Sequence, residues 1–387
     1  MRHLSSRRPL AVALAMRSAL LSGLLLLAAM PAASQAPGAF ARFGMGARAA
    51  VLGPQAGDAF GDTSPYHNPA LGPFQASQGM EITGALLDFD REWTAVQVGA
   101  PLQPRAGLAG GFVQARVTGI DGRDESGYST GEFDVSEQAF FVAFGTRLSS
   151  KVAAGVGLRV YRSDLAEEIR PPTALGFSLG LAAKPSDRFS FGLVAEDLFA
   201  QYNWNASAVG GGTVADRFPV RLRGGAAYRL GGTPEDGGLL LAAEFEGQIR
   251  SAETREAGGI GTIGGIPTAE TVETDLRLGE TLARVGAEYE LVDAFAVRAG
   301  VDRLLLGDAG ELRPSAGFSV SPRLGELDIR IDYAATLESY GTGIAQTATL
   351  RVDVWRVEPA RYAEFRVWLQ RGDQALTTPL VFETHEN

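Results

Sequence analysis

The sequence has no cysteine and three histidines, and only two of its 35 basic residues are lysine. Without cysteine there is no disulfide framework, no thiol nucleophile and no thiolate metal site. The histidines, His3, His67 and His385, lie far apart, and no HExxH-like spacing indicates a zinc site. No GxSxG elbow indicates a Ser-His-Asp triad either. We therefore expect no metal, no cofactor and no enzymatic activity.

The chain also lacks a positive excess. Its formal net charge is −10. Residues 1–36 hold four arginines and no acid, so the net charge of residues 37–387 is −14 (−10 minus 4). Proteins that bind nucleic acid neutralise phosphates with basic surfaces. We therefore expect no nucleic-acid partner.

Long hydrophobic runs are missing beyond the N-terminus, which argues against a helical membrane protein. The one apolar stretch, "SALLSGLLLLAAMPAASQA" at residues 18–36, follows several arginines and ends in small residues, as in a secretory signal peptide. A membrane anchor is the alternative, but a spanning helix needs about 20 apolar residues. We predict a signal peptide over residues 1–36, with the start at Met1 or Met16 left open, and hence export.

The dominant pattern after residue 80 is strict alternation of apolar and polar side chains. It is clear in "FPVRLRGGAAYRL" at residues 218–230 and in "LDIRIDYAA" at residues 327–335. Successive side chains of a strand point to opposite faces, so each segment has one apolar and one polar or small face. Such segments lie near 80–88, 92–100, 105–117, 135–147, 151–162, 173–183, 188–196, 218–230, 238–250, 281–291, 294–303, 312–321, 325–335 and 344–354.

Several of these segments are longer than a usual globular strand, and short and long connections alternate between them. Long polar links are expected at 118–134, 197–217 and 251–280. Bacterial membrane barrels have long tilted strands, an even strand number, and short turns at one end with long loops at the other. A soluble all-β protein is the alternative, but its polar face would point outward. We predict an all-β fold, a 14-stranded antiparallel outer-membrane β-barrel.

Charged side chains of both signs lie on the polar faces of the predicted strands. Two interpretations are open: a pore whose charges tune selectivity, or a cross-strand ionic network that holds a plugged barrel. The balanced signs favour the network, because buried charges are tolerated only when they are paired or hydrated. The set comprises Arg221, Arg223, Glu244, Glu246, Arg284, Glu288, Arg298, Asp302, Asp328, Arg330, Arg351 and Asp353.

Two segments fall outside the predicted barrel of residues 80–354. Residues 37–79 are rich in Gly, Pro and Ala without strand periodicity, and we predict an N-terminal plug there. Pro65, Pro69 and Pro73 exclude a regular helix, because proline fixes φ and removes a backbone donor. His67 between them is expected to be packed or hydrogen-bonded rather than a catalytic base.

Residues 355–387 form a mixed tail, predicted to be periplasmic and without an assigned role. A competing register would make "YAEFRVWLQ" or "TPLVFET" in this tail a barrel strand.

The chain resembles the PorV/PorQ family of outer-membrane proteins, within the wider FadL-like class of fourteen-stranded barrels. The resemblance begins in "GMGARAAVLGPQAGDAFGDTSPYHNPALG", where the family's Asn-Pro-Ala signature falls on Asn68, Pro69 and Ala70, and continues in "GLVAEDL" and "ARVGAEYELVDAFAVRAGVDR". It implies a plug motif at those three residues. From the proline-rich stretch around them, Pro65, His67 and Pro73 are expected to support the plug.

The resemblance also implies a function at the cell outer membrane, in contact with its lipid. The main expectation is an interaction protein, a cargo shuttle or scaffold of type IX secretion, with secretion components and cargo proteins as partners. The alternative, from the wider class, is a channel for hydrophobic small molecules.

Overall fold

A computed structural model provides the structure. It describes residues 36–53, 55–60, 64–124, 126–165, 170–205, 213–231, 238–256, 271–292, 294–304, 311–324, 327–356, 363–371 and 374–382. The predicted signal peptide, residues 1–36, lies outside these ranges except for Ala36. Within them, no helix is long and apolar enough to cross a membrane.

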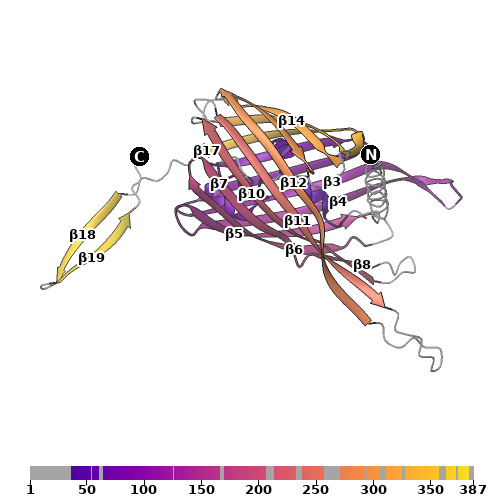
Figure 1. Ribbon diagram of the computed structural model, residues 1–387, viewed down its shortest axis with the longest axis horizontal. Coiled ribbons are helices and arrows are strands. Elements are labelled where there is room, and N and C mark those ends of the chain that lie inside the picture. The colour runs from indigo at the N-terminus through magenta and orange to yellow at the C-terminus, as the bar shows by residue number, and fades with distance from the viewer. Residues whose placement is uncertain are drawn as a thin grey trace, which may run out of the picture. The chain divides into compact units, whose positions relative to one another are not determined.

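Fourteen antiparallel strands form a closed barrel (Figure 1), and the sheet closes where β14 pairs with β16. The predicted fold class is thereby confirmed, and each predicted segment contains a strand. The strands are β1 (Ser77–Leu87), β2 (Arg91–Leu102), β3 (Ala106–Arg123), β4 (Ser129–Arg147), β5 (Val152–Asp164), β6 (Thr173–Ser186), β7 (Phe189–Leu198), β10 (Val220–Gly231), β11 (Gly238–Glu256), β12 (Thr271–Val292), β13 (Phe295–Asp302), β14 (Arg313–Val320), β16 (Leu327–Leu337) and β17 (Ile344–Arg356).

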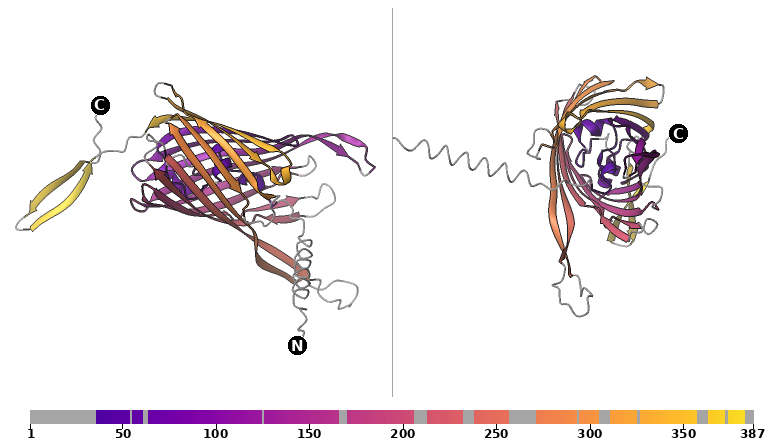
Figure 2. Two further views of the ribbon diagram at one scale, coloured as in Figure 1. Left: turned by 45° about the horizontal axis from the view of Figure 1, so that its top comes forward. Right: turned by 90° about the vertical axis from the view of Figure 1, so that its right-hand side faces the viewer.

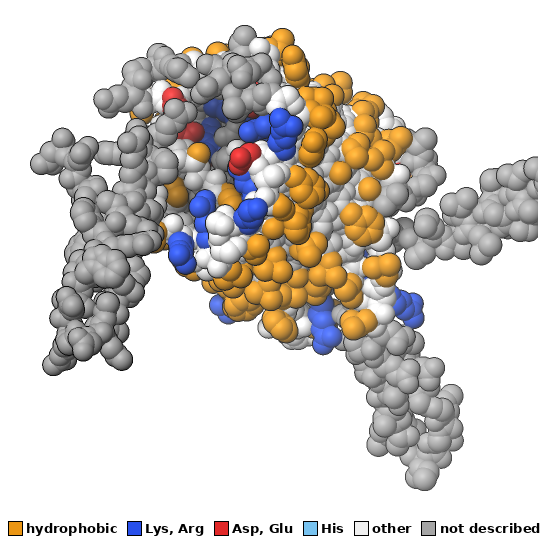
Figure 3. All heavy atoms as spheres, turned by 60° about the vertical axis from the view of Figure 1, so that its left-hand side comes forward, with side chains coloured by type: hydrophobic (Ala, Val, Ile, Leu, Met, Phe, Trp, Pro, Cys, Tyr) orange, Lys and Arg blue, Asp and Glu red, His pale blue; other side chains and the backbone are white. Residues whose placement is uncertain are grey.

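Alternation along each strand separates an apolar outer wall from a polar or small inner face. In β6, Phe177, Leu179 and Leu181 are exposed on the outside, whereas Ser178 and Ala182, at alternate positions of the strand, are buried in the interior. Apolar side chains cover much of the outer wall in Figure 3. A sheet exposed to lipid requires this arrangement, because the hydrocarbon interior solvates apolar groups and not charges.

The structure corrects three predicted links. In the expected loops 118–134 and 251–280, β3 continues to Arg123, β4 begins at Ser129, β11 continues to Glu256 and β12 begins at Thr271. The expected loop 197–217 holds a separate hairpin of β8 (Gln201–Asn205) and β9 (Thr213–Arg217). Polar residues form these extensions because hairpin pairing needs backbone hydrogen bonds and not an apolar face.

The competing register for the C-terminal tail is wrong. Strands β18 (Ala363–Arg371) and β19 (Gln374–Phe382) pair with each other in a two-stranded sheet, and neither belongs to the sheet of the barrel. The short β15 (Arg323–Leu324) extends the pairing of β16.

The N-terminal segment lies inside the barrel as a plug, shown in indigo in the right view of Figure 2. It contains the 3-10 helix η1 (Ala39–Arg42), the helix α2 (Ala47–Leu52) and the 3-10 helix η2 (Pro69–Phe74). Helix α2 packs against β12, β13, β14, β16 and β17, whereas η2 packs against β2 to β6 on another part of the wall. The plug therefore crosses the lumen.

The two ends of the barrel differ. Short connections such as 148–151 and 187–188 lie at one end, here the turn end, where β1 begins and β17 finishes. Longer connections such as 199–219 lie at the opposite loop end, together with the 3-10 helix η6 (Ser339–Gly341).

A charge on the outer wall is predicted to destabilise the barrel, and more strongly the deeper the substituted residue lies in the membrane. Leu181 lies mid-strand on β6 and is 51% exposed, whereas Leu148 lies in a turn and is 62% exposed. We expect Leu181→Arg to lower the unfolding free energy in lipid vesicles by roughly 2–4 kcal/mol and Leu148→Arg by at most about 1 kcal/mol. Denaturant titration checks this; equal losses would contradict a membrane-embedded wall.

Candidate functional site: the plug and the lumen wall

Asn68 connects two parts of the plug and joins them to β6 of the wall. Its Nδ2 donates to the backbone oxygens of Ala56, at 2.7 Å, and Leu181, at 3.0 Å. Its Oδ1 accepts the Ala70 N–H at 3.0 Å and so caps η2. The side chain is fully buried. An amide with donors and acceptor can satisfy all three partners, which a carboxylate cannot.

The inner face of the wall carries glycines where the turn at Asn68 and Pro69 approaches it. A Cβ at Gly180 would overlap Asn68 Oδ1, and a Cβ at Gly145 or Gly155 would overlap the Pro69 carbonyl. These glycines allow backbone to pack directly on the inner face of the sheet. The remaining predicted plug residues, Ala70, Pro65 and Pro73, are also buried.

His67 is a packed, hydrogen-bonded side chain. Its Nε2 accepts the backbone N–H of Met45 at 3.2 Å, which joins two turns of the plug. Burial, followed by the nearby Arg223 guanidinium, lowers the pKa of His67 from 6.5 to about 3. His67 is therefore neutral at physiological pH, as an acceptor at Nε2 requires.

A first charged cluster crosses the inner wall from β5 to β13. Glu196 on β7 lies 2.9 Å from Arg159 Nη2, 3.3 Å from Arg221 Nη1 and 2.9 Å from Arg223 Nε. Glu246 receives two hydrogen bonds from Arg221, at 2.9 and 3.1 Å. The cluster continues through Glu244, Arg284 and Asp302.

This cluster also binds the backbone of the plug. Arg159 donates to the Tyr66 carbonyl and Arg223 to the His67 carbonyl, each at 2.5 Å. Glu244 accepts the Ala56 N–H at 2.7 Å. Charged partners make such hydrogen bonds strong, so the wall holds a segment that has little regular secondary structure of its own.

A second cluster joins α2 to the opposite part of the wall. Arg48 of α2 donates two hydrogen bonds to Glu288, at 2.9 and 3.0 Å, and pairs with Asp58 at 2.9 Å. Arg298 bonds Glu288 and lies 2.8 Å from Asp332. Arg330 bonds Asp332 at 3.1 Å.

The remaining predicted lumen charges lie outside these two clusters. Arg351 and Asp353 pair with each other on β17 at 3.0 Å. Asp328 is exposed at the end of β16, so its predicted place within the buried network is wrong. Strand ends project into solvent, where a carboxylate needs no partner.

Five network residues were not among the predicted set. Glu196, Arg159 and Asp332 occupy inward positions of strands, so the same alternation could have identified them. Arg48 and Asp58 belong to the plug, where the sequence has no periodicity from which to infer their direction.

Aromatic side chains fill the lumen towards the loop end around η1. Phe40 packs among Tyr161, Phe218 and Trp93, with ring centroids of Tyr161 and Phe218 4.7 Å apart. Trp93 Nε1 donates to the Phe40 carbonyl at 3.0 Å. The full cluster adds Phe43, Tyr66, Phe141, Tyr202 and Trp204.

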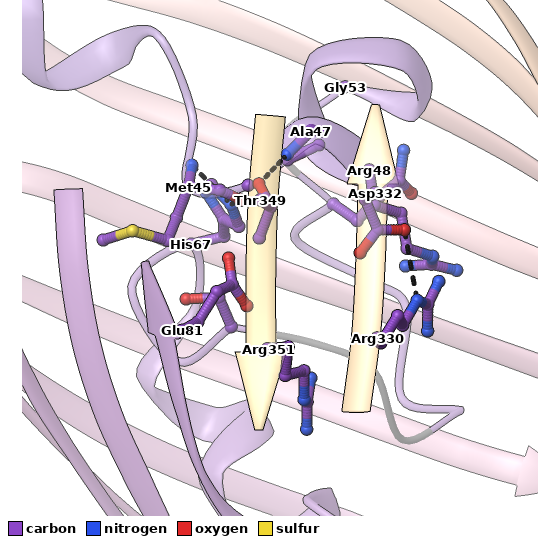
Figure 4. Close-up of a pocket in the computed structure, with 14 residues that line it drawn as sticks. Met45, Ala47, Arg48, Gly53, His67, Glu81, Arg330, Asp332, Thr349 and Arg351 are labelled. Atoms are coloured by element: carbon purple, nitrogen blue, oxygen red, sulfur yellow. Dashed lines mark hydrogen bonds and ion pairs between the residues drawn. The ribbon is translucent and has the colours of Figure 1, made fainter. Parts of the chain in front are cut away.

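Two small polar cavities separate the plug from the wall. The one in Figure 4, about 40 Å³, is bordered by Met45–Gly53 of the plug and by Glu81, Arg330 and Arg351 of the wall. The other, about 60 Å³, lies beside Arg42 and Phe43. Both are much smaller than the roughly 150 Å³ of an apolar cavity that accepts benzene. A ligand of that size fits neither cavity unless the plug moves.

No protein-family model and no curated protein sequence matches the chain. Among solved structures, the Pseudomonas putida toluene transporter TodX aligns with a TM-score of 0.50 at 13% identity, over 80% of this chain and 96% of that one. The chain shares its fold with this transporter. The Ralstonia pickettii toluene transporter TbuX gives 0.48 at 12% identity, over 80% and 97% of the two chains. A Pseudomonas aeruginosa FadL homologue gives 0.48 at 12%, over 80% and 98%.

The likeness to TodX concerns the fold alone, at so low an identity. The predicted fold, a fourteen-stranded barrel, is supported by it, whereas the FadL-like class and the narrower PorV/PorQ resemblance stay predictions.

Removing the central carboxylate of the first cluster is predicted to destabilise the protein strongly. Glu196→Gln leaves Arg159, Arg221 and Arg223 without their shared counter-charge in a buried site. We expect a loss of about 3–5 kcal/mol in unfolding free energy, measured by denaturant titration in detergent micelles.

The matched control is Asp134→Asn, which removes one partner of the exposed Arg116–Asp134 pair. An exposed pair contributes at most about 1 kcal/mol. Similar losses in both variants would show that the first cluster is hydrated and not buried.

The lowered pKa of His67 predicts an acid-sensitive plug. The unfolded chain takes up a proton near pH 6.5 and the folded chain only near pH 3, so stability falls between these values as pH decreases. The slope is about 1.4 kcal/mol per pH unit. His67→Gln retains an acceptor but does not titrate, so the difference between wild type and variant should change by that slope below pH 6.5. A constant difference from pH 7 to pH 5 would refute a buried neutral His67.

Proposed function

We propose that this protein is an outer-membrane channel for hydrophobic small molecules and that its N-terminal segment closes the channel at rest. The observation that carries the proposal is an apolar-walled barrel whose lumen is filled by a plug bonded to paired wall charges. In this lumen the charges pair with one another and with the plug, so the described residues leave no open water-filled path for ions. A porin, in contrast, has a water-filled lumen. The shared fold with a toluene transporter supports the same function.

The aromatic cluster at the loop end is the proposed region of first contact for a ligand. Aromatic side chains present large apolar surfaces there, around Phe40 and Trp93. A hydrophobic molecule that replaced the plug side chain Phe40 would keep these surfaces covered. The ligand could therefore enter while the plug is displaced.

In this proposal the signal peptide exports the chain, the outer wall contacts outer-membrane lipid, and the turn end faces the periplasm. Residues 37–79 act as the plug, residues 80–354 as the barrel, and residues 355–387 have no assigned role. The protein carries out no chemistry on its ligand.

A role as shuttle or scaffold in type IX secretion remains a prediction from the PorV/PorQ resemblance. No match to a family model or a curated sequence supports that role. The small-molecule channel accounts for the plug, the closed lumen and the fold together, so we place it first.

Uptake measurements test the channel. Purified protein in lipid vesicles is expected to raise the initial rate of uptake of an environment-sensitive aromatic hydrocarbon probe several-fold over empty vesicles, with no increase for glycerol. An uptake rate equal to that of empty vesicles would remove the proposal.

Loosening the plug is expected to open the lumen to ions as well. Asn68→Ala removes two hydrogen bonds within the plug, to Ala56 and Ala70, and the bond to Leu181 of the wall, so conductance in planar bilayers should rise from a low wild-type level by about tenfold. Asn203→Ala, at an exposed asparagine of β8, is the control and should leave conductance unchanged. A wild-type protein that already conducts as freely as Asn68→Ala would contradict closure by the plug.

A further inference from the structure

Four basic side chains gather at the turn end of the barrel, and none of them has an acidic partner among the residues that the structure describes. Arg147 lies on β4, Lys151 directly before β5, Lys184 on β6 and Arg229 on β10. These strands lie in the order β4, β5, β6, β7, β10 along the wall. None of the four forms an ion pair with another described residue, in contrast to the paired charges deeper in the lumen. Lys151 and Lys184 are also the only lysines of the chain.

Three of these side chains border a cleft between the wall and the plug, and Arg229 lies against Phe60 in its lining. The cleft has a volume of about 660 Å³, and its lining includes Arg147, Lys151, Lys184 and the plug residues Phe60 and Phe74. That volume lies within the roughly 300–1,000 Å³ of common ligand sites.

The plug holds three of the cations in place through its aromatic rings. The Arg147 guanidinium lies 5.1 Å from the centre of the Phe74 ring, and the Lys184 ammonium lies 5.1 Å from that of Phe60. Arg229 lies over Phe60 at 4.8 Å. Arg147 also donates to the Pro73 carbonyl at 2.8 Å. Contacts to ring faces orient these cations without neutralising their charge.

The charge balance of the cleft is strongly positive. Asp187 is the one acid in its described lining, and Arg188 follows directly in the same turn. The described lining therefore keeps an excess of positive charge in a chain whose net charge is −10. Figure 3, which brings this end of the barrel towards the viewer, shows Lys and Arg side chains there, with a few Asp and Glu side chains among them.

We propose that this cleft binds a phosphate group. Several cations that converge from separate strands suit a compact anion with multiple charges and acceptor oxygens, and arginine and lysine are the side chains that bind phosphate in proteins. The same chemistry is available from the headgroup of a phospholipid in the adjoining leaflet or from a free phosphate compound. Exposed apolar residues such as Leu148 on the same turn could accept acyl chains, so the headgroup is a sterically reasonable source.

The test compares wild type with Lys151→Gln/Lys184→Gln, which removes two of the four charges and, among the described residues, no hydrogen bond to the plug. Arg116→Gln/Arg162→Gln removes the same number of charges from exposed positions away from the cleft and is the matched control. Lys151→Arg/Lys184→Arg keeps the charge and should keep binding. Heat-modifiable gel migration verifies that each variant is folded.

Two binding measurements distinguish the sources of phosphate. Calorimetry in a nonionic detergent at fixed low salt measures glycerol 3-phosphate, and native mass spectrometry measures retention of phosphatidylglycerol against diacylglycerol after mixing with vesicles of each composition. Glycerol 3-phosphate binding supports a free compound, and selective retention of phosphatidylglycerol supports a headgroup.

In either measurement we expect the Lys→Gln pair to bind about tenfold more weakly than wild type. Absence of both kinds of binding would overturn the proposal. So would equal affinity of the wild type and the Lys→Gln pair, or an equal loss in the control pair. Uptake of hydrophobic compounds is a separate property and is not needed for either measurement.

Discussion

The pairing of inward-facing charges is the interaction on which the rest of this structure depends. An outer wall in lipid must be apolar, and the period of a strand then sends every polar side chain inward. Filling the lumen with a plug removes the water that would hydrate those charges, so each needs an opposite charge or a backbone partner. Glu196, shared by three arginines, shows how closely the wall meets this requirement.

Plug and wall satisfy each other's polar groups. The plug has few backbone hydrogen bonds of its own, and the arginines of the wall supply donors to its carbonyl groups at Tyr66 and His67. In return, Arg48 from the plug completes the partners of Glu288 on the wall. Glycines such as Gly180 permit this contact by leaving room for the backbone of the plug. The closed state is therefore a property of both parts and not of the plug alone.

The two ends of the lumen differ in chemistry. Towards the loop end the plug is surrounded by aromatic rings, and at the turn end it is bordered by cations that form no ion pair within the described part of the chain. A hydrophobic molecule would meet a favourable surface at the first end and a charged one at the second. The two ends thus present different surfaces to the same molecule.

The sequence by itself determined the strands, their number, and which face of each strand is apolar. Alternation is a local property that any sufficiently long strand displays. It indicated that Arg221, Glu246, Glu288 and Arg298 point inward for the same reason. Which charges meet was decided by the tertiary structure, since pairing depends on register and on the path of the plug. Arg48 and Asp58 lie in the plug, whose sequence shows no periodicity from which the direction of a side chain could be inferred. Their contacts exist only because the plug crosses the lumen. The hairpin extensions and the separate pairing of β18 with β19 likewise depend on backbone hydrogen bonds between strands, which side-chain patterns do not encode.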